Sequence, residues 1–279
     1  MRFRVGCALM ATPAPSFVDA TTWTALGDGR YQGTMHASWY QGRGAFGGVL
    51  GGAMLRSMMR ELNDAARQPR SFTVHFCAPV SEGELLLTVR TERAGRQVTH
   101  LTARLEQQGQ VVCVASATFA VSRQTSLVYQ QVKVPEVPPV AEVPSTSEDA
   151  PLPAFAHHFE YRWFAGMPYS GASEARMGGW IRPRVPTQLD APLAVALLDA
   201  FPPSPVARVD GFCNLATMDL TVHFYAPLPP EGASPEAFWL RTAQSRQASE
   251  GYADDLAELW DAEGRLLAQC RQMVAVFPG

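Results

Sequence analysis

The sequence predicts an α+β protein built from two tandem copies of one unit, in which an antiparallel sheet wraps around a long central helix. Three observations predict it: a strand-like segment that occurs twice, an apolar helical segment before each occurrence, and a series of strands and turns after the first. The 279 residues leave room for two domains of about 120–150 residues each.

The repeat is clear in the residues themselves. The segment Ser71–Pro79 returns as Asp219–Pro227, with Thr, Val, His, Phe, Ala and Pro at the same places. A second similarity pairs Gly109–Ala117 with Gly264–Gln272, which lie further apart along the chain than the first pair. The difference predicts an insertion in the second copy, within the Pro- and Gly-rich segment Pro229–Pro235.

A helical segment comes before each repeated strand. In the first copy, apolar residues recur at helical spacing behind a glycine-rich start: Phe46, Val49, Leu50, Ala53, Met54, Met58 and Leu62. In the second copy, Asp190 is a predicted N-cap with Pro192 in the first turn, and an apolar run follows to Phe201. Pro202 and Pro203 are expected to end that helix.

Strands follow the first helix at regular intervals. They are predicted at Phe72–Cys77, Glu84–Arg93, Val98–Gln107 and Val111–Val121, and turn residues between them favour an antiparallel meander. A proline-rich stretch, Gln124 to His158, separates the copies. We therefore expect an N-terminal domain over residues 1–123, a linker over 124–158 and a C-terminal domain over 159–279.

Composition excludes several classes of function. Lys+Arg 23 against Asp+Glu 26 offers no basic face for nucleic acid or an anionic membrane. Five cysteines without a Cys-x-x-Cys pair suit a reducing compartment, and the apolar run Val5–Ala11 is at the lower limit for a signal peptide, so we expect a cytoplasmic protein. No run of apolar residues is long enough to span a membrane.

The sequence also lacks the motifs of several enzyme classes. It contains neither a nucleotide-binding motif nor the nucleophile elbow of serine hydrolases. The pair His157-His158 lacks further ligands at metal-ligand spacing, so we interpret it as part of a solvated linker.

Asp199 is the one charged residue inside the second helical segment. That segment is apolar on nearly every side, so the helix should be buried all round. A carboxylate there is costly unless it is hydrogen-bonded or paired. Asp199 is thus either a general base of raised basicity or a structural acid satisfied by its neighbours.

Several short motifs occur in one order along nearly the whole chain: Phe46-Gly-Gly48, Ser71-Phe72, Ala78-Pro79, Trp180-Ile-Arg182, Leu198-Asp199, Ala216-Thr-Met-Asp219 and Gln272. With them the chain resembles the acyl-CoA thioesterase II family, in which two hotdog domains are fused. The resemblance implies hydrolysis of a fatty acyl-CoA to free acid and coenzyme A, without metal or cofactor. It also implies that Asp199, Thr217 and Gln272 hold the attacking water.

The pattern of the strands tests two of these roles. Gln272 is the polar exception on an otherwise apolar strand face, so it is either a site residue or a core amide bonded to a neighbouring strand. Thr217 alternates with the apolar row Ala216, Met218 and Leu220. It would point away from the helix unless a bulge lies between Thr217 and Leu220.

The two copies are not equivalent. Ala117 stands where the repeat would place a second Gln272, and the first helix has no acid before Glu61. We expect one site per chain, with the first copy binding substrate through Phe46, Gly47 and Gly48. Free N–H groups at that helix start can stabilise an oxyanion, although glycines there can equally serve close packing.

Alternatives remain open at this point. The first is a hotdog protein that only binds acyl-CoA or acyl chains, and the second is a hotdog hydratase or dehydratase, which would need a His beside Asp199. His75 and His223 occupy equivalent repeat positions, and we interpret them as structural. Fused hotdogs resemble a dimer in one chain, and a homo-oligomer formed through sheet packing is expected. The acyl chain length is not predicted.

Overall fold

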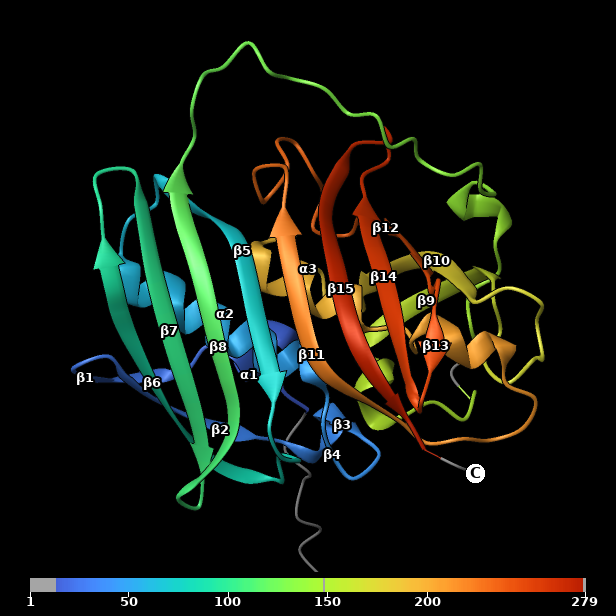
Figure 1. The fold of residues 1–279 in the computed structure, drawn as a ribbon, viewed down its shortest axis with the longest axis horizontal. Coiled ribbons are helices and arrows are strands. Elements are labelled where there is room, and N and C mark those ends of the chain that lie inside the picture. The colour runs from blue at the N-terminus through green and yellow to red at the C-terminus, as the bar shows by residue number, and fades with distance from the viewer. Residues whose placement is uncertain (1–13, 148, 278–279) are drawn as a thin grey trace, which may run out of the picture.

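The computed structural model describes residues 14–147 and 149–277, so the apolar run at residues 5–11 lies outside the described residues. Two halves, each with two strands, a central helix and four further strands in the same order, share a 13-stranded antiparallel sheet, and the two central helices lie behind it (Figure 1). Among the described residues, no helix is long and apolar enough to cross a membrane.

The first half contains the predicted helix and its four strands. These are α2 (Gly47–Leu62), β5 (Arg67–Phe76), β6 (Gly83–Ala94), β7 (Val98–Gln107) and β8 (Gln110–Val121). Each strand lies within a few residues of its predicted bounds except at the start of β5. Before α2 come elements that the sequence pattern did not indicate: α1 (Phe17–Thr21), β1 (Thr24–Gly27), β2 (Arg30–Met35), the 3-10 helix η1 (Ala37–Trp39), β3 (Tyr40–Gln41) and β4 (Gly44–Ala45).

The second half repeats this plan. It contains β9 (Phe159–Ala165), β10 (Arg176–Pro183), α3 (Ala191–Asp199), η4 (Ser204–Arg208), β11 (Leu215–Phe224), β12 (Trp239–Gln244), β13 (Ala248–Ser249), β14 (Tyr252–Trp260) and β15 (Leu266–Val276). The Asp190 carboxylate caps α3 by accepting the Leu193 N–H at 2.8 Å, as predicted. The helix ends at Asp199, two residues before the predicted end, with Ala200 as its C-cap.

The two repeated strands pair with each other at the centre of the sheet. The order runs β1-β2-β6-β7-β8-β5 in the first half and continues as β11-β15-β14-β12-β10-β9 in the second, while β3 and β4 form a separate ribbon. β5 and β11 are antiparallel, and Thr73 lies opposite its repeat equivalent Thr221, with the two hydroxyl oxygens 3.1 Å apart. The repeat therefore produces a pseudo-twofold axis between these strands.

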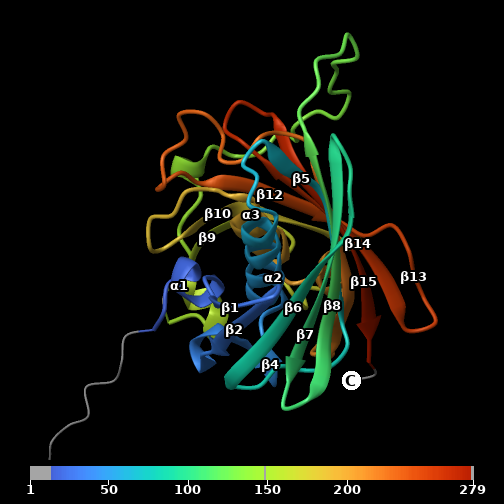
Figure 2. The ribbon, with the colours of Figure 1, turned by 90° about the vertical axis from the view of Figure 1, so that its left-hand side faces the viewer.

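The sheet curves around α2 and α3, which pack against each other on its concave side (Figure 2). Every residue of α3 is buried, which confirms that this helix is surrounded. A Cβ on Gly48 would lie 2.8 Å from the Ala196 Cα, so the close crossing of the two helices requires glycine at that position.

The segment between the halves begins as a long loop outside the sheet (Figure 1) and contains η2 (Val140–Glu142) and η3 (Ala154–His158). At its end, the Phe155 ring stacks on Phe46 with centroids 4.0 Å apart, and His158 stacks on Trp39 at 3.8 Å. The expectation that both linker histidines are solvated is therefore wrong for His158, because its ring packs against Trp39 of the first half.

Candidate functional site

Asp199 lies at the end of α3, where the helix meets the other half of the chain. Its side chain is 8% exposed. One carboxylate oxygen accepts the Gln272 Nε2–H at 3.2 Å, and the Gly48 N–H also hydrogen-bonds to the carboxylate. A carboxylate at a helix C-terminus faces the negative end of that helix dipole, whereas the Gly48 N–H belongs to the positive end of α2. Asp199 thus bridges the two helices.

Gln272 links Asp199 to Thr217. It lies on β15 with 2% of its surface exposed, on the inward face that it shares with Cys270 and Val274. Its Oε1 accepts a hydrogen bond from Thr217 Oγ1 at 2.9 Å, while its Nε2 donates to the carboxylate. The two partners fix the orientation of the amide, because an ionised carboxylate can only accept.

A β-bulge turns Thr217 toward this pair. Along β11 and β15, Thr217 lies opposite Val274 and Asp219 lies opposite Met273, so Met218 is the extra residue. The bulge that Thr217 would need is therefore present, and its half-buried hydroxyl reaches Gln272. The predicted apolar row was wrong at its start: Ala216 and Met218 are exposed, and the buried row begins at Leu220.

The start of α2 forms the opposite wall of the site. The N-cap residue Phe46 offers no side-chain cap, so the N–H groups of the first turn are left for other acceptors. A Cβ on Gly47 would lie 2.8 Å from Asp199 Oδ2 and 2.8 Å from the Phe76 ring, so the carboxylate approaches the backbone closely here. Phe46 itself is fully buried against Phe155, and its ring supports this turn from behind.

The environment of Asp199 favours its neutral form. Burial raises its pKa to about 7, against the lowering effects of Arg241, of the Gln272 amide and of the Gly48 N–H; Asp255 raises it further. A carboxylate with a pKa near neutrality can accept a proton and return it at physiological pH.

Sequence reasoning missed the charged residues behind Asp199. Arg241 on β12 is fully buried, with its Nη2 3.6 Å from Asp255 Oδ2 on β14. Ser204 donates to Asp255 through its N–H, at 3.0 Å, and through its hydroxyl. An arginine directly after Trp239 and Leu240 is the signal that could have identified this pair, since an isolated charge in an apolar strand has to find a buried partner.

The first half has the same backbone without the same side chains. β5 carries a register shift between Pro69 and Ser71, at the place that corresponds to the bulge of β11. There, Pro69 takes the position of Thr217 and Ala117 that of Gln272, and Leu55 stands as far from its N-cap as Asp199 does. All three are buried and apolar. The corresponding place in the first half therefore lacks the three polar side chains of the site.

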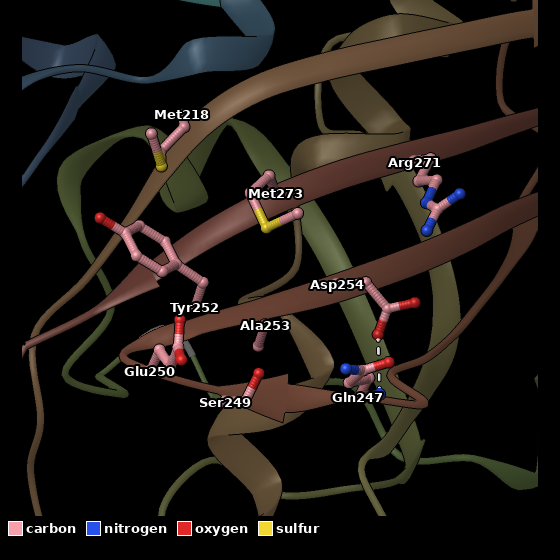
Figure 3. A pocket seen from close by; sticks show the side chains of 9 residues that line it. All are labelled: Met218, Gln247, Ser249, Glu250, Tyr252, Ala253, Asp254, Arg271 and Met273. Carbon is pink, nitrogen blue, oxygen red and sulfur yellow. Dashed lines mark hydrogen bonds between the residues drawn. The ribbon is translucent and has the colours of Figure 1, made fainter.

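Other candidate residues lie away from the site. His75 and His223 are exposed on the outer face of the sheet, and within residues 14–147 and 149–277 no group of three or more His, Cys, Asp or Glu is arranged to hold a metal. A hollow of about 470 Å³ lies on the outer face of the second half (Figure 3). Met218 and Met273 line it beside Arg271, Asp254 and Tyr252, so these neighbours of the site residues face the opposite side of the sheet.

Comparison with known families matches both halves. Residues 35–120 match the model of the acyl-CoA thioesterase N-terminal domain, and residues 134–276 match that of the C-terminal domain. The chain belongs to the acyl-CoA thioesterase family. No curated protein matches the sequence significantly.

Solved structures confirm the fold. A hotdog-fold protein of unknown function from Alicyclobacillus acidocaldarius is 30% identical, with 94% of this chain and 98% of that chain covered and a TM-score of 0.86. A TesB protein from Mycobacterium avium subspecies paratuberculosis is 20% identical (94% and 98% covered, TM-score 0.77). An acyl-CoA thioesterase II from Mycobacterium marinum is 19% identical (95% and 99% covered, TM-score 0.76). This member of the acyl-CoA thioesterase family thus has the predicted double hotdog fold.

Proposed function

We propose that the protein hydrolyses fatty acyl-CoA thioesters to free acid and coenzyme A, with Asp199 as the general base. The observation that carries this proposal is the hydrogen-bonded series Thr217–Gln272–Asp199, buried against the N-terminus of α2. A desolvated carboxylate of raised pKa next to N–H groups that can receive an anion meets the needs of acyl transfer to water. Membership of the thioesterase family supports the same reaction class.

In the proposed mechanism, Asp199 removes a proton from a water molecule, and the water oxygen attacks the thioester carbonyl carbon. The negative charge that develops on the carbonyl oxygen is stabilised by N–H groups at the start of α2. Since the Gly48 N–H already bonds to Asp199, we assign this role to the Gly47 N–H. When the tetrahedral intermediate collapses, the carbon–sulfur bond breaks and the protonated Asp199 returns the proton to the coenzyme A thiolate.

Gln272 and Thr217 hold the water in this scheme. An amide between a hydroxyl donor and a carboxylate has a fixed orientation and can bond a water without competing for its proton. Thr217 acts through the amide, to which its half-buried hydroxyl donates.

The alternatives have less support. A hydratase or dehydratase would use a His beside the acid, and no His is among the described groups that act on the ionisation of Asp199. We further propose a cytoplasmic protein, supported by its buried free thiols Cys113 and Cys270, and a homo-oligomer formed through the sheet, supported by the exposed Met218 and Tyr252 on its outer face. Neither nucleic acid nor a membrane is a proposed partner.

The test is thiol release from acyl-CoA esters of increasing chain length. We expect activity in the wild type and its loss in Asp199→Asn, with the fold checked by circular dichroism. Asp190→Asn is the matched control on the same helix, since asparagine caps a helix as well as aspartate does; it gives up only the partly exposed ion pair of Asp190 with Arg56. Full activity of Asp199→Asn would exclude the mechanism, and acyl-CoA recovered intact from the wild type would favour the binding module.

A further inference from the structure

The buried ion pair Arg241–Asp255 has no part in the mechanism above. Both side chains are fully buried, yet Nη1 of Arg241 and Oδ2 of Asp255 have no hydrogen-bond partner among the described residues. Buried charges with unmet hydrogen bonds cost free energy, and apolar residues of similar volume are often as stable. The pair is therefore better explained by what it does to its neighbours than by stability.

Arg241 contacts the chain on both sides of Asp199. Its Nε and Nη2 donate to the Leu198 carbonyl oxygen at 3.3 and 3.1 Å, and its Cζ lies 5.0 Å from the centre of the Phe201 ring. The carbonyl of Ala200 accepts from the Tyr161 hydroxyl at 3.0 Å. Carbonyls in the last turn of a helix have no intrahelical donor, so these bonds fix the turn that carries Asp199.

We propose that Arg241 is a positioning residue for the hydrolytic reaction. Its guanidinium holds the turn from which Asp199 leaves α3 and places a positive charge behind the carboxylate, while Asp255 limits the effect of that charge. Ser204 in turn holds Asp255 through two hydrogen bonds. This inference rests on the proposed function. It adds Arg241 and Asp255 as the two residues that control the ionisation of Asp199.

Four ionisable side chains act on Asp199 or are acted on by it, each from a different strand. They are Tyr161 on β9, Arg241 on β12, Asp255 on β14 and Cys270 on β15. Tyr161 and Cys270 remain neutral at physiological pH because burial raises the pKa of each. From α2, the contact is the Gly48 N–H. Arg241 and Asp255 are thus the two charges that count, and they act in opposite directions. Burial raises the pKa of Asp255, while Arg241 and the two hydrogen bonds from Ser204 favour its ionised form.

Because the two charges act in opposite directions, the dependence of kcat/KM on pH in three single variants tests the inference. In Arg241→Gln, the acid limb of the profile moves to higher pH by about one unit, because the ionised base loses its cation. In Asp255→Asn, the limb moves to lower pH, because Arg241 is then unopposed. Arg241→Lys keeps the limb near its wild-type position but lowers kcat roughly 10-fold, since lysine cannot hold the Leu198 carbonyl with the same fork.

Two outcomes would overturn the inference. If Arg241→Gln and Asp255→Asn lower kcat equally at every pH with the limb unmoved, the pair is only structural. Movement of both limbs in the same direction contradicts the charge assignment. If Arg241→Gln does not fold, Asp255→Asn and Arg241→Lys decide the matter by the same criteria.

A second readout separates this inference from the proposed function. The titration of Asp199 is followed by carbon-13 NMR of aspartate-labelled protein, with Asp199→Asn identifying the signal. A wild type that releases no thiol would refute the proposed function. The shifts of the Asp199 titration in Arg241→Gln and Asp255→Asn would still show whether the pair sets the charge of this carboxylate.

Discussion

Replacing Asp199 with asparagine is expected to stabilise the protein while it removes activity. The pKa of Asp199 rises from 3.8 in an unfolded chain to about 7 in the fold, chiefly through burial. At about 1.4 kcal/mol per pKa unit, ionisation of Asp199 costs the folded state about 4 kcal/mol above pH 7. Asparagine keeps an acceptor for Gln272 and weakens the bond from the Gly48 N–H, which is worth about 1 kcal/mol. The net gain is about 3 kcal/mol.

The size of this gain in stability depends on pH. A carboxyl group whose pKa is raised by folding contributes its full stability below the unfolded value of 3.8, and that contribution is lost as pH rises through about 7. The gain from Asp199→Asn should therefore be present at pH 8.5 and small at pH 5. Thermal and urea unfolding at both values measure it, and a rise in Tm of roughly 6 °C is expected at pH 8.5.

Asp254 provides the control of opposite sign. Burial works against its ionisation, but the N–H groups of Arg246 and Gln247 and the Ser245 hydroxyl outweigh burial and hold its pKa below the ordinary value. Asp254→Asn should destabilise the protein at neutral pH. An equal change in stability for Asp199→Asn at pH 5 and pH 8.5, or no gain at pH 8.5, would refute the reasoning.

Three further predictions concern the site. The kcat/KM of the wild type should rise with pH through a single acid limb near pH 7, the pKa of Asp199, and a limb below pH 5 would contradict its assignment as base. Gly47→Ala should lower kcat about 100-fold because the new Cβ would lie 2.8 Å from Asp199 Oδ2. The control Gly51→Ala should retain activity, because its Cβ would meet only apolar side chains, Val195 at 3.0 Å, Phe72 at 3.4 Å and Val74 at 3.9 Å; similar kcat values for both variants would refute this. Thr217→Val should lower kcat roughly 10-fold with little change in Tm, and the control Thr221→Val should not lower it.

Asp199 and Gln272 stand out in the sequence because each breaks a pattern, and the resemblance to the thioesterase family then implied their roles. One is the charge in an apolar helix and the other is the amide on an apolar strand face, and both signals are local in sequence. The inward orientation of Thr217 could not be predicted in the same way. It depends on a bulge at Met218 in the pairing of β11 with β15. The alternation of polar and apolar residues along β11 does not indicate where such a bulge lies.

Contacts between strands explain most of what the sequence pattern did not reveal. The partner of Arg241 lies on β14, and pairing of this kind becomes visible only when strand order is known. The edge strand β1 has four exposed residues and thus no alternation to detect. By contrast, β9 alternates buried and half-buried positions at its start, Phe159 to Tyr161, and its pattern could have been recognised.

The hydrogen bond between Gly48 and Asp199 bears on why the two hotdog units are joined in one chain. In the proposed mechanism the base comes from one hotdog unit and the N–H groups at the start of α2 come from the other, so neither unit would contain a complete site by itself. A covalent chain supplies both units in equal number and at high effective concentration. It also lets the two units diverge, so that one can supply the proposed base and the other the Gly47 N–H, a division of labour that two identical subunits could not evolve independently.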